Sequence, residues 1–428
     1  MSEILICNGR VIDPSQNLDR LTNVLVQDGR IAAFDVTENG QATIIDATDR
    51  IVAPGLIDLH VQLREPGHEE DETIESGTAA ALAGGFTAIA YMPNTDPPLD
   101  TQASVEYVRQ KASRADHCRV YVLACVSKNQ EGKELAEIGT LVEAGAVGLT
   151  DAPRPLHNAE LLRRAFEYCR MFKKPIFSHP EVVELTHDGI MHEGQTSMVL
   201  GLAGMPADAE DVMTGRDLRL AEATGGQLHL MNISSGGSVD LIRRAKARGV
   251  AVSAEVCPPH FSLTDHALRS FNSNFKINPP LRSQDHVEAC IEGLADGTID
   301  VIASGHAPRA SEKKMRELDQ APFGMVNLET TLALTITYLI SAGHLDWTTA
   351  ISKLTINPAR VLGIDKGTLQ IGADADITII NPEVRWQVCA EEFYSPSTNT
   401  AYEGMELQGR ADQVLVGGRI KYAAGKVL

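Results

Sequence analysis

Short hydrophobic runs separated by turn residues mark both ends of the chain. In the N-terminal part such runs are followed by Asn-Gly or Asp-Gly, dipeptides typical of tight β-hairpin turns. The C-terminal residues return to this style, and the runs are Ile4–Ile6, Val24–Val26, Ile377–Ile380 and Val414–Val416. Because the two ends of a chain commonly meet in space, we predict one small β-sandwich domain formed by residues 1–53 and 366–428.

The pattern changes between these ends. Over residues 54–365 a short apolar strand, a loop with polar residues and an amphipathic helix recur about eight times, as in a (β/α)₈ barrel. The expected strands include Phe86–Tyr91, Val120–Ala124, Gly148–Thr150, Pro175–Phe177, Leu228–Leu230, Val250–Val252 and Val301–Ala303. The alternative, an open doubly wound sheet, lacks a Gly-x-Gly-x-x-Gly turn after its first strand. We therefore predict an α/β fold with a TIM barrel, whose chemistry lies at the carboxyl ends of the strands.

Composition and charge restrict the class of protein. The chain has 428 residues, of which 43% are hydrophobic and 22% charged, as in ordinary globular proteins. Its net charge of −19 makes nucleic acid and anionic membranes poor partners. We find neither a signal-peptide pattern nor an apolar stretch of membrane-spanning length. Seven cysteines without Cys-x-x-Cys spacing suit small buried residues in a reducing compartment, so we expect a cytoplasmic protein.

The first candidate for chemistry follows the apolar run Ile51–Ile57. Positions 60 and 62 share one face of an extended strand, so two histidines there would offer both imidazoles to one metal ion. The residues present are His60 and Gln62. Because a neutral amide is a weak zinc ligand, the pair is broken.

Many motifs, in order along nearly the whole chain, resemble the bacterial dihydroorotases of the cyclic amidohydrolase superfamily. They include Pro54-Gly55-Leu56-Ile57-Asp58-x-His60, Arg64-Glu65-Pro66-Gly67, Met92-Pro93-Asn94-Thr95, Asn278-Pro279-Pro280-Leu281-Arg282, His306-Ala307-Pro308 and Ala321-Pro322-Phe323-Gly324. The resemblance implies a metal-dependent barrel that interconverts carbamoyl aspartate and dihydroorotate in pyrimidine synthesis. In that chemistry a metal-activated hydroxide attacks the ring amide and a carboxylate carries the proton.

Most positions that the resemblance assigns to this chemistry are changed. His60 and His179 match histidine ligands. The changed positions are Gln62 for a second histidine, Ala152 for an acidic ligand, Asn232 for a histidine, Gly305 for the proton-carrying aspartate and Arg309 for a histidine that would face the substrate. We therefore expect no metal cofactor, because two isolated histidines cannot replace a charged, chelating set.

The alternative is a reduced zinc site built from His60, His179 and Asp151. Asp151 is a doubtful ligand, since it adjoins the family position and neighbouring strand residues point to opposite faces. Neutral, hydrogen-bonded histidines remain the simpler interpretation of His60 and His179. His229 and His306 are expected to be structural.

The positions that contact substrate are better preserved. Arg64 matches the family's carboxylate fork, a geometry suited to bidentate recognition of a planar acid. Asn94 and Asn278 match the other substrate-contacting positions. The alternatives are an ion pair of Arg64 with Glu65 or Asp58, and turn-forming side-chain hydrogen bonds for the two asparagines.

These observations favour an intact fold with no competent catalytic centre. Some bacterial relatives with broken metal motifs act as non-catalytic subunits that support aspartate carbamoyltransferase, and the resemblance implies that partner here. We also expect a homo-oligomer. Two alternatives remain open: an active dihydroorotase with a reduced metal site, and a sensor that binds a dihydroorotate-like small acid through Arg64.

Overall fold

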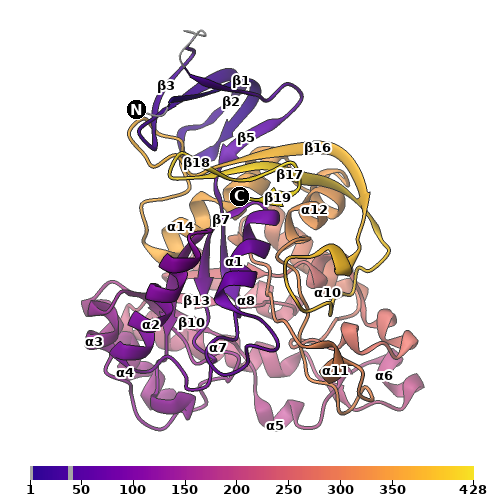
Figure 1. Cartoon of the computed structure of the whole chain (residues 1–428). Helices are drawn as coiled ribbons and strands as arrows, with labels where there is room; N and C mark the ends of the chain where they lie inside the picture. Colours follow the sequence, from indigo (N-terminus) through magenta and orange to yellow (C-terminus); the bar gives the residue numbers. More distant parts are fainter. Residues whose placement is uncertain (1–2, 37–41) are drawn as a thin grey trace.

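The computed structural model describes residues 3–36 and 42–428, so residues 1–2 and 37–41 of the predicted terminal domain lie outside the described residues. It contains a parallel barrel sheet and a second sheet built from both ends of the chain, which confirms the predicted fold class. In Figure 1 the indigo N-terminal strands and the yellow C-terminal strands form one body above the barrel. No helix of the described residues is long and apolar enough to cross a membrane.

The barrel sheet has eight strands in the order β15-β14-β13-β10-β9-β8-β7-β6. The strands are β6 (Leu56–Val61), β7 (Phe86–Tyr91), β8 (Arg119–Ala124), β9 (Ala146–Leu149), β10 (Ile176–Ser178), β13 (Leu228–Leu230), β14 (Val252–Val256) and β15 (Val301–Ile302). A parallel bridge between Val61 and His306 joins β6 to the segment that follows β15 and nearly closes the ring. The carboxyl ends of all eight strands therefore face one side of the molecule.

The terminal sheet has nine strands. They are β1 (Glu3–Asp13), β2 (Leu18–Gln27), β3 (Arg30–Phe34), β4 (Thr43–Asp46), β5 (Ile51–Pro54), β16 (Ile377–Gln387), β17 (Glu406–Val416), β18 (Arg419–Ala423) and β19 (Lys426–Val427). β5 joins the two halves, because it pairs parallel to β1 and antiparallel to β16. Both ends of the chain thus contribute to one hydrogen-bonded sheet.

Helices cover the barrel between its strands (Figure 1). The longer ones are α1 (Ile74–Ala83), α2 (Gln102–Ala115), α4 (Ala159–Met171), α7 (Asp208–Thr224), α8 (Gly236–Ala247), α10 (Gln284–Ala295), α13 (Trp347–Leu354) and α14 (Ile356–Leu362). The shorter ones are α3 (Ile138–Glu143), α5 (Val183–Thr186), α6 (Gln195–Leu200), α9 (Pro259–Ser262), α11 (Ser311–Lys314) and α12 (Thr331–Thr335). Two further strands, β11 (Met191–His192) and β12 (Gly204–Met205), pair with each other in a small parallel sheet. α1 begins at a capping box, in which the Thr73 and Ser76 side chains accept from each other's backbone N–H groups.

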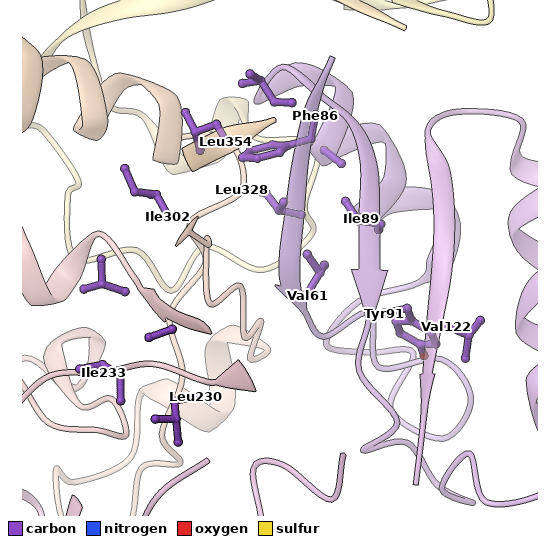
Figure 2. Close-up of a cluster of buried hydrophobic side chains, with 14 of the residues drawn as sticks. Val61, Phe86, Ile89, Tyr91, Val122, Leu230, Ile233, Ile302, Leu328 and Leu354 are labelled. Carbon is purple, nitrogen blue, oxygen red and sulfur yellow. The ribbon is translucent and has the colours of Figure 1, made fainter. Parts of the chain in front are cut away.

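The hydrophobic core lies between the barrel strands and these helices. Figure 2 shows part of it, with Phe86 and Ile89 of β7 beside Val61, and Leu230 of β13 beside Ile233. These side chains are fully buried. Burial of this apolar surface supplies the main driving force for folding and holds the strand ends in place.

The structure divides one predicted apolar run and moves the bounds of several predicted strands, among which β14 moves furthest. The run Ile51–Ile57 belongs to β5 and β6, which part at Gly55, where a Cβ atom would lie 2.0 Å from the Thr87 hydroxyl oxygen. The strand expected at Val250–Val252 is instead β14, which starts at Val252 and ends at Val256. A buried charge at Glu255 interrupts the apolar pattern there, which hid the second half of this strand from sequence analysis.

Candidate functional site

A cavity of about 360 Å³ opens at the carboxyl ends of the barrel strands. Residues at or after the ends of β6, β13, β14 and β15 line it, including His60, Asn232, Cys257 and Gly305. This is where a TIM barrel carries its chemistry. The cavity therefore contains most of the positions singled out from the sequence.

His60 belongs to a buried network with Glu255 and His229. The Nδ1 atom of His60 lies 2.8 Å from one carboxylate oxygen of Glu255, and Nε2 of His229 lies 3.1 Å from the other. Burial alone would raise the pKa of Glu255, but the hydrogen bonds from His229 and His60 outweigh it and lower this pKa to about 2. Glu255 is thus an ionised carboxylate that accepts from both imidazoles. His229 also bonds Ser253 through Nδ1, at 2.8 Å, in agreement with the structural role expected of it.

Gln62 and Asn94 form a neutral amide pair. The Asn94 Nδ2 group donates to Gln62 Oε1 over 3.0 Å. This bond occupies the amide oxygen that would have to bind a metal ion at position 62. This bond also connects Asn94 to a residue just after β6. The hydrogen bond within its own turn, which was the expected alternative for Asn94, is therefore not the one that the structure shows.

Asn232, Cys257 and Gly305 meet on another wall of the cavity. The Cys257 thiol donates a short hydrogen bond to Asn232 Oδ1. A Cβ atom at Gly305 would lie 2.6 Å from Cys257 Sγ, and Gly305 has a φ of +61°. Both the occupied space and the left-handed backbone disfavour a side chain at this position.

The Asp151 carboxylate does not line the cavity. Its Oδ1 accepts from the backbone N–H groups of Val126 and Ser127 at 2.8 and 3.0 Å, and its Oδ2 accepts from the Ser127 hydroxyl. This carboxylate ties the loop after β8 to the end of β9. The neighbouring Ala152 is buried and offers no ligand atom.

His179 pairs with Glu181 and not with His60. Its Nε2 lies 3.1 Å from Glu181 Oε2, which also accepts from Asn278 Nδ2 over 2.8 Å. Burial opposes ionisation of Glu181, but His179 and the other donors lower its pKa to about 2. In the described part of the chain, the candidate metal-holding group that includes His60 contains neither His179 nor Asp151. His60, His179 and Asp151 are thus not found as a group of potential ligands within 4.8 Å of one another in the described residues.

Arg64 is buried with one part of its guanidinium unpaired. Its Nε donates to the Pro308 carbonyl over 3.3 Å, while Nη2 has no hydrogen-bond partner. Burial, followed by the charge of Arg309, lowers the pKa of Arg64 to about 9. The expected alternative, an ion pair with Glu65 or Asp58, is not formed: Glu65 bonds Lys111 at 2.8 Å, and Asp58 Oδ1 accepts from the backbone N–H groups of His60 and Ser304.

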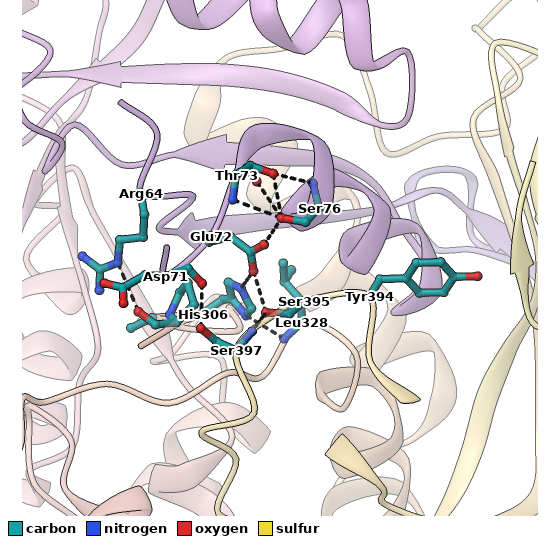
Figure 3. Close-up of polar contacts among 12 residues, drawn as sticks. Arg64, Asp71, Glu72, Thr73, Ser76, His306, Leu328, Tyr394, Ser395 and Ser397 are labelled. Atoms are coloured by element: carbon teal, nitrogen blue, oxygen red, sulfur yellow. Dashed lines mark hydrogen bonds and ion pairs between the residues drawn. The ribbon is translucent and has the colours of Figure 1, made fainter. Parts of the chain in front are cut away.

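His306 has the structural role expected of it. Its Nδ1 accepts from the backbone N–H groups of Asn327 and Leu328, so Nε2 carries the proton and donates to Glu72 over 3.3 Å. Glu72 also accepts from Ser395 over 2.6 Å and from Ser76. Figure 3 shows this hub, which connects the barrel loops to the segment between β16 and β17.

The residues present do not fit the metal cluster that the family resemblance implies. His60, Glu255 and Cys257 are the three potential ligands that lie within 4.8 Å of one another among the described residues. Both oxygens of Glu255 already accept from imidazole groups, and the Cys257 thiol donates to Asn232 Oδ1. This donor set is a hydrogen-bonded network with a neutral thiol, which differs from the charged, chelating sets of zinc hydrolases.

Four residues of this cavity and of the network beside it were not predicted from the sequence: Glu255, Cys257, His260 and Asn327. Two of them carried a signal, since Glu255 stands among apolar residues of one strand and Cys257 follows at i+2, on the same face. A charge inside an apolar strand indicates a buried, paired group. His260 and Asn327 sit in loops, where no periodicity points to them.

The parallel barrel, the sheet from both termini and the histidine-lined cavity define an amidohydrolase-type barrel. The amidohydrolase family matches residues 51–421. A dihydroorotase of Pelotomaculum thermopropionicum is 48% identical, covering 98% of both chains, and one of Syntrophus aciditrophicus is 47% identical, covering 98% of this chain and 99% of that one. The solved structure of an L-hydantoinase (dihydropyrimidinase) from Arthrobacter aurescens superposes with a TM-score of 0.90 at 26% identity, covering 100% of this chain and 98% of that one. The chain therefore belongs to the amidohydrolase family and is a member of its dihydroorotase branch.

Proposed function

We propose that this chain is a non-catalytic, dihydroorotase-like protein of pyrimidine biosynthesis. The observation that carries the proposal is the contact of Cys257 with Gly305: a thiol occupies the space that a proton-carrying side chain at position 305 would need. Without a carboxylate there, no group is placed to take the proton in ring opening or closure. Gln62 and Asn232, whose amide oxygens are engaged by neighbouring side chains, add to this argument.

The proposed role is that of a subunit supporting aspartate carbamoyltransferase, as the resemblance implies for relatives with broken metal motifs. We expect the partner enzyme to co-purify with this chain from native extract, and the chain to form a homo-oligomer in the cytoplasm. Isolation as a lone oligomer, with full carbamoyltransferase activity elsewhere in the extract, would contradict the role.

The proposed absence of catalysis is tested with purified protein that has been prepared without a chelator. We expect no turnover of dihydroorotate or carbamoyl aspartate and less than stoichiometric zinc by metal analysis. Addition of zinc is expected to leave activity absent, because position 305 supplies no proton carrier. Turnover that depends on bound zinc would overturn the proposal.

A second candidate function is an active dihydroorotase with a reduced metal site. It would require His60, Glu255 and Cys257, which lie within 4.8 Å of one another, to exchange their present hydrogen bonds for a zinc ion, since imidazole, carboxylate and thiolate are all zinc ligands. If it is correct, Cys257→Ser should remove both zinc and activity. The matched control is Cys290→Ser, another buried cysteine, whose thiol lies 3.8 Å from the Ile233 carbonyl oxygen.

A further inference from the structure

A second hollow, of about 440 Å³, adjoins the cavity, and we call it the vestibule. Its walls come from the loops that follow β6, β7, β8 and β9 and from the segment after β15, and they include His68, Asn129, Arg154 and Arg309. The positions that the resemblance assigns to metal binding and proton transfer do not line it. The vestibule is therefore a separate space beside the candidate catalytic cavity.

The wall of the vestibule is positively charged, in contrast to the chain as a whole. Three of its lining residues are arginines, namely Arg64, Arg154 and Arg309, and Asp96 is the one acidic residue among the described residues that line it. The whole chain carries a net charge of −19. An acidic protein that gathers guanidinium groups around one hollow attracts anions there, although its surface repels them elsewhere.

Two of the three arginines have neutral partners. Among the described residues, Arg64 and Arg154 form no ion pair. Nε of Arg64 donates to the Pro308 carbonyl oxygen over 3.3 Å, and Nη1 of Arg154 donates to the Gln130 carbonyl oxygen over 3.5 Å. A carbonyl oxygen accepts a hydrogen bond but carries no full charge. The positive charge of both side chains is thus left without a carboxylate beside it.

The third arginine, Arg309, shares its carboxylate with a lysine. Nη1 of Arg309 lies 3.5 Å from Asp71 Oδ2, while Nζ of Lys313 lies 2.8 Å from Oδ1 of the same residue. Burial and, after it, the charge of Arg309 lower the pKa of Arg64, so the two guanidinium groups repel each other. An anion in the vestibule would relieve this repulsion.

These features favour a small anion with a double charge and several oxygen atoms. A hollow of this volume accepts a small molecule. Three arginines against one aspartate leave two positive charges in excess, which one phosphate dianion balances and one carboxylate does not. Guanidinium groups also match the geometry of phosphate, to which each can donate two parallel hydrogen bonds.

We propose that the vestibule is a binding site for a phosphate group, held by Arg154 and Arg309. The group is supplied either as inorganic phosphate or as the phosphate monoester of a small molecule. This ligand differs in charge and shape from the carboxylic acid that the resemblance implies for the cavity. The site requires neither a metal ion nor proton transfer, so it is independent of the proposed function.

The experiment measures binding by calorimetry at constant ionic strength, with inorganic phosphate and with acetate, which carries one charge. The wild-type chain is expected to bind phosphate at least roughly tenfold more tightly than acetate. Arg154→Gln and Arg309→Gln should each weaken phosphate binding by about tenfold. Since Arg309→Gln also removes the contact with Asp71, its unfolding is measured beside its binding, whereas Arg154 is exposed and its variant should fold like the wild type.

Methyl phosphate, measured in the same way, decides between the two sources of the phosphate group. Binding as tight as that of inorganic phosphate assigns the site to a phosphate monoester. Exclusion of methyl phosphate assigns it to free phosphate. Both results support the site.

Arg360→Gln is the matched control. Arg360 is also exposed and forms no ion pair among the described residues, but it lines another hollow, at the amino ends of β13 and β14. Its variant loses the same charge and should bind phosphate as the wild type does. Equal weakening in all three variants would show attraction by overall charge alone and overturn the proposal.

Two further results would also overturn it. One is equal affinity of the wild-type chain for phosphate and acetate. The other is unchanged phosphate affinity in both Arg154→Gln and Arg309→Gln. None of these outcomes bears on catalysis, which is judged by the separate turnover assay.

Discussion

The thiol of Cys257 lies where the side chain of any residue at position 305 would begin. The distance from Cys257 Sγ to a Cβ atom at Gly305 would be 2.6 Å, closer than real Cβ contacts. The two positions therefore constrain each other: a side chain at position 305 would require the Cys257 thiol to move.

This relationship predicts that Gly305→Ala is destabilising beyond its backbone effect. Gly249→Ala is the matched control, because Gly249 also has a positive φ, +80°, but nothing lies within 4 Å of its Cβ position. We expect Gly305→Ala to lower the free energy of unfolding by about 1–3 kcal/mol more than Gly249→Ala does, measured by urea denaturation. The double variant Gly305→Ala/Cys257→Ala should recover much of the difference. Equal losses in the two single variants would show that the thiol moves aside without cost.

The buried Glu255 predicts a loss of stability in acid. Its folded-state pKa of about 2 lies below the ordinary value of 4.5, so the unfolded chain takes up the proton first as the pH falls. The stabilisation is complete above about pH 5 and is lost progressively toward pH 2, with a size of about 3 kcal/mol. Unfolding free energies measured across this range should show the slope in the wild type and a smaller one in Glu255→Gln.

Glu160→Gln is the control for that experiment. The pKa of Glu160 is also lowered to about 2, by hydrogen bonds from Arg163 and Arg164, but this carboxylate is on the surface of α4. Its effect should be small and should disappear in high salt, whereas that of Glu255 should persist. The same salt sensitivity in both variants would contradict the buried network.

The Ser395 hydroxyl should stabilise the contact between the barrel and the C-terminal segment. It donates to Glu72 over 2.6 Å, inside the hub that also holds His306 (Figure 3). Ser395→Ala removes one donor from a buried carboxylate and should cost about 1–3 kcal/mol in unfolding free energy. Ser270→Ala, which removes an exposed local bond to the Ala267 carbonyl, should cost much less. Equal costs would mean that water replaces the Ser395 hydroxyl.

The barrel core predicts a large cavity penalty at Leu230. This side chain is 0% exposed and packs in the cluster of Figure 2. Leu230→Ala is expected to lower the unfolding free energy by about 2–5 kcal/mol. Leu21→Ala should change it by less than about 0.5 kcal/mol, because Leu21 is 74% exposed. Thermal or urea unfolding of both variants gives the comparison.

Much of the fold could be predicted because its signals are local. The strand Phe86–Tyr91 was expected with the bounds that the structure shows for β7, and Leu228–Leu230 with those of β13. Both are short apolar runs bounded by turn residues. β14 was misplaced, because the charge of Glu255 is stabilised by hydrogen bonds from imidazoles on other strands, and a local pattern contains no information about such partners.

The candidate site could be predicted only in part. His60 and Arg64 both line the cavity. This could be predicted, because residues at the carboxyl end of a barrel strand face the site. A hydrogen-bonded His179 was the simpler interpretation, but its carboxylate partner, Glu181, two residues along its own loop, was not named. Short-range partners of this kind depend on loop geometry, which strand periodicity does not specify.

From its residues alone, the chain determines a barrel with a terminal β domain and the absence of chelating side chains at 62, 152, 232 and 305, since these are properties of pattern and residue type. The tertiary structure decides what occupies the resulting space: the thiol of Cys257 beside Gly305, and Glu255 between His60 and His229. Those contacts join residues from separate strands and loops. Their distances arise only when the closed barrel brings the strand ends together.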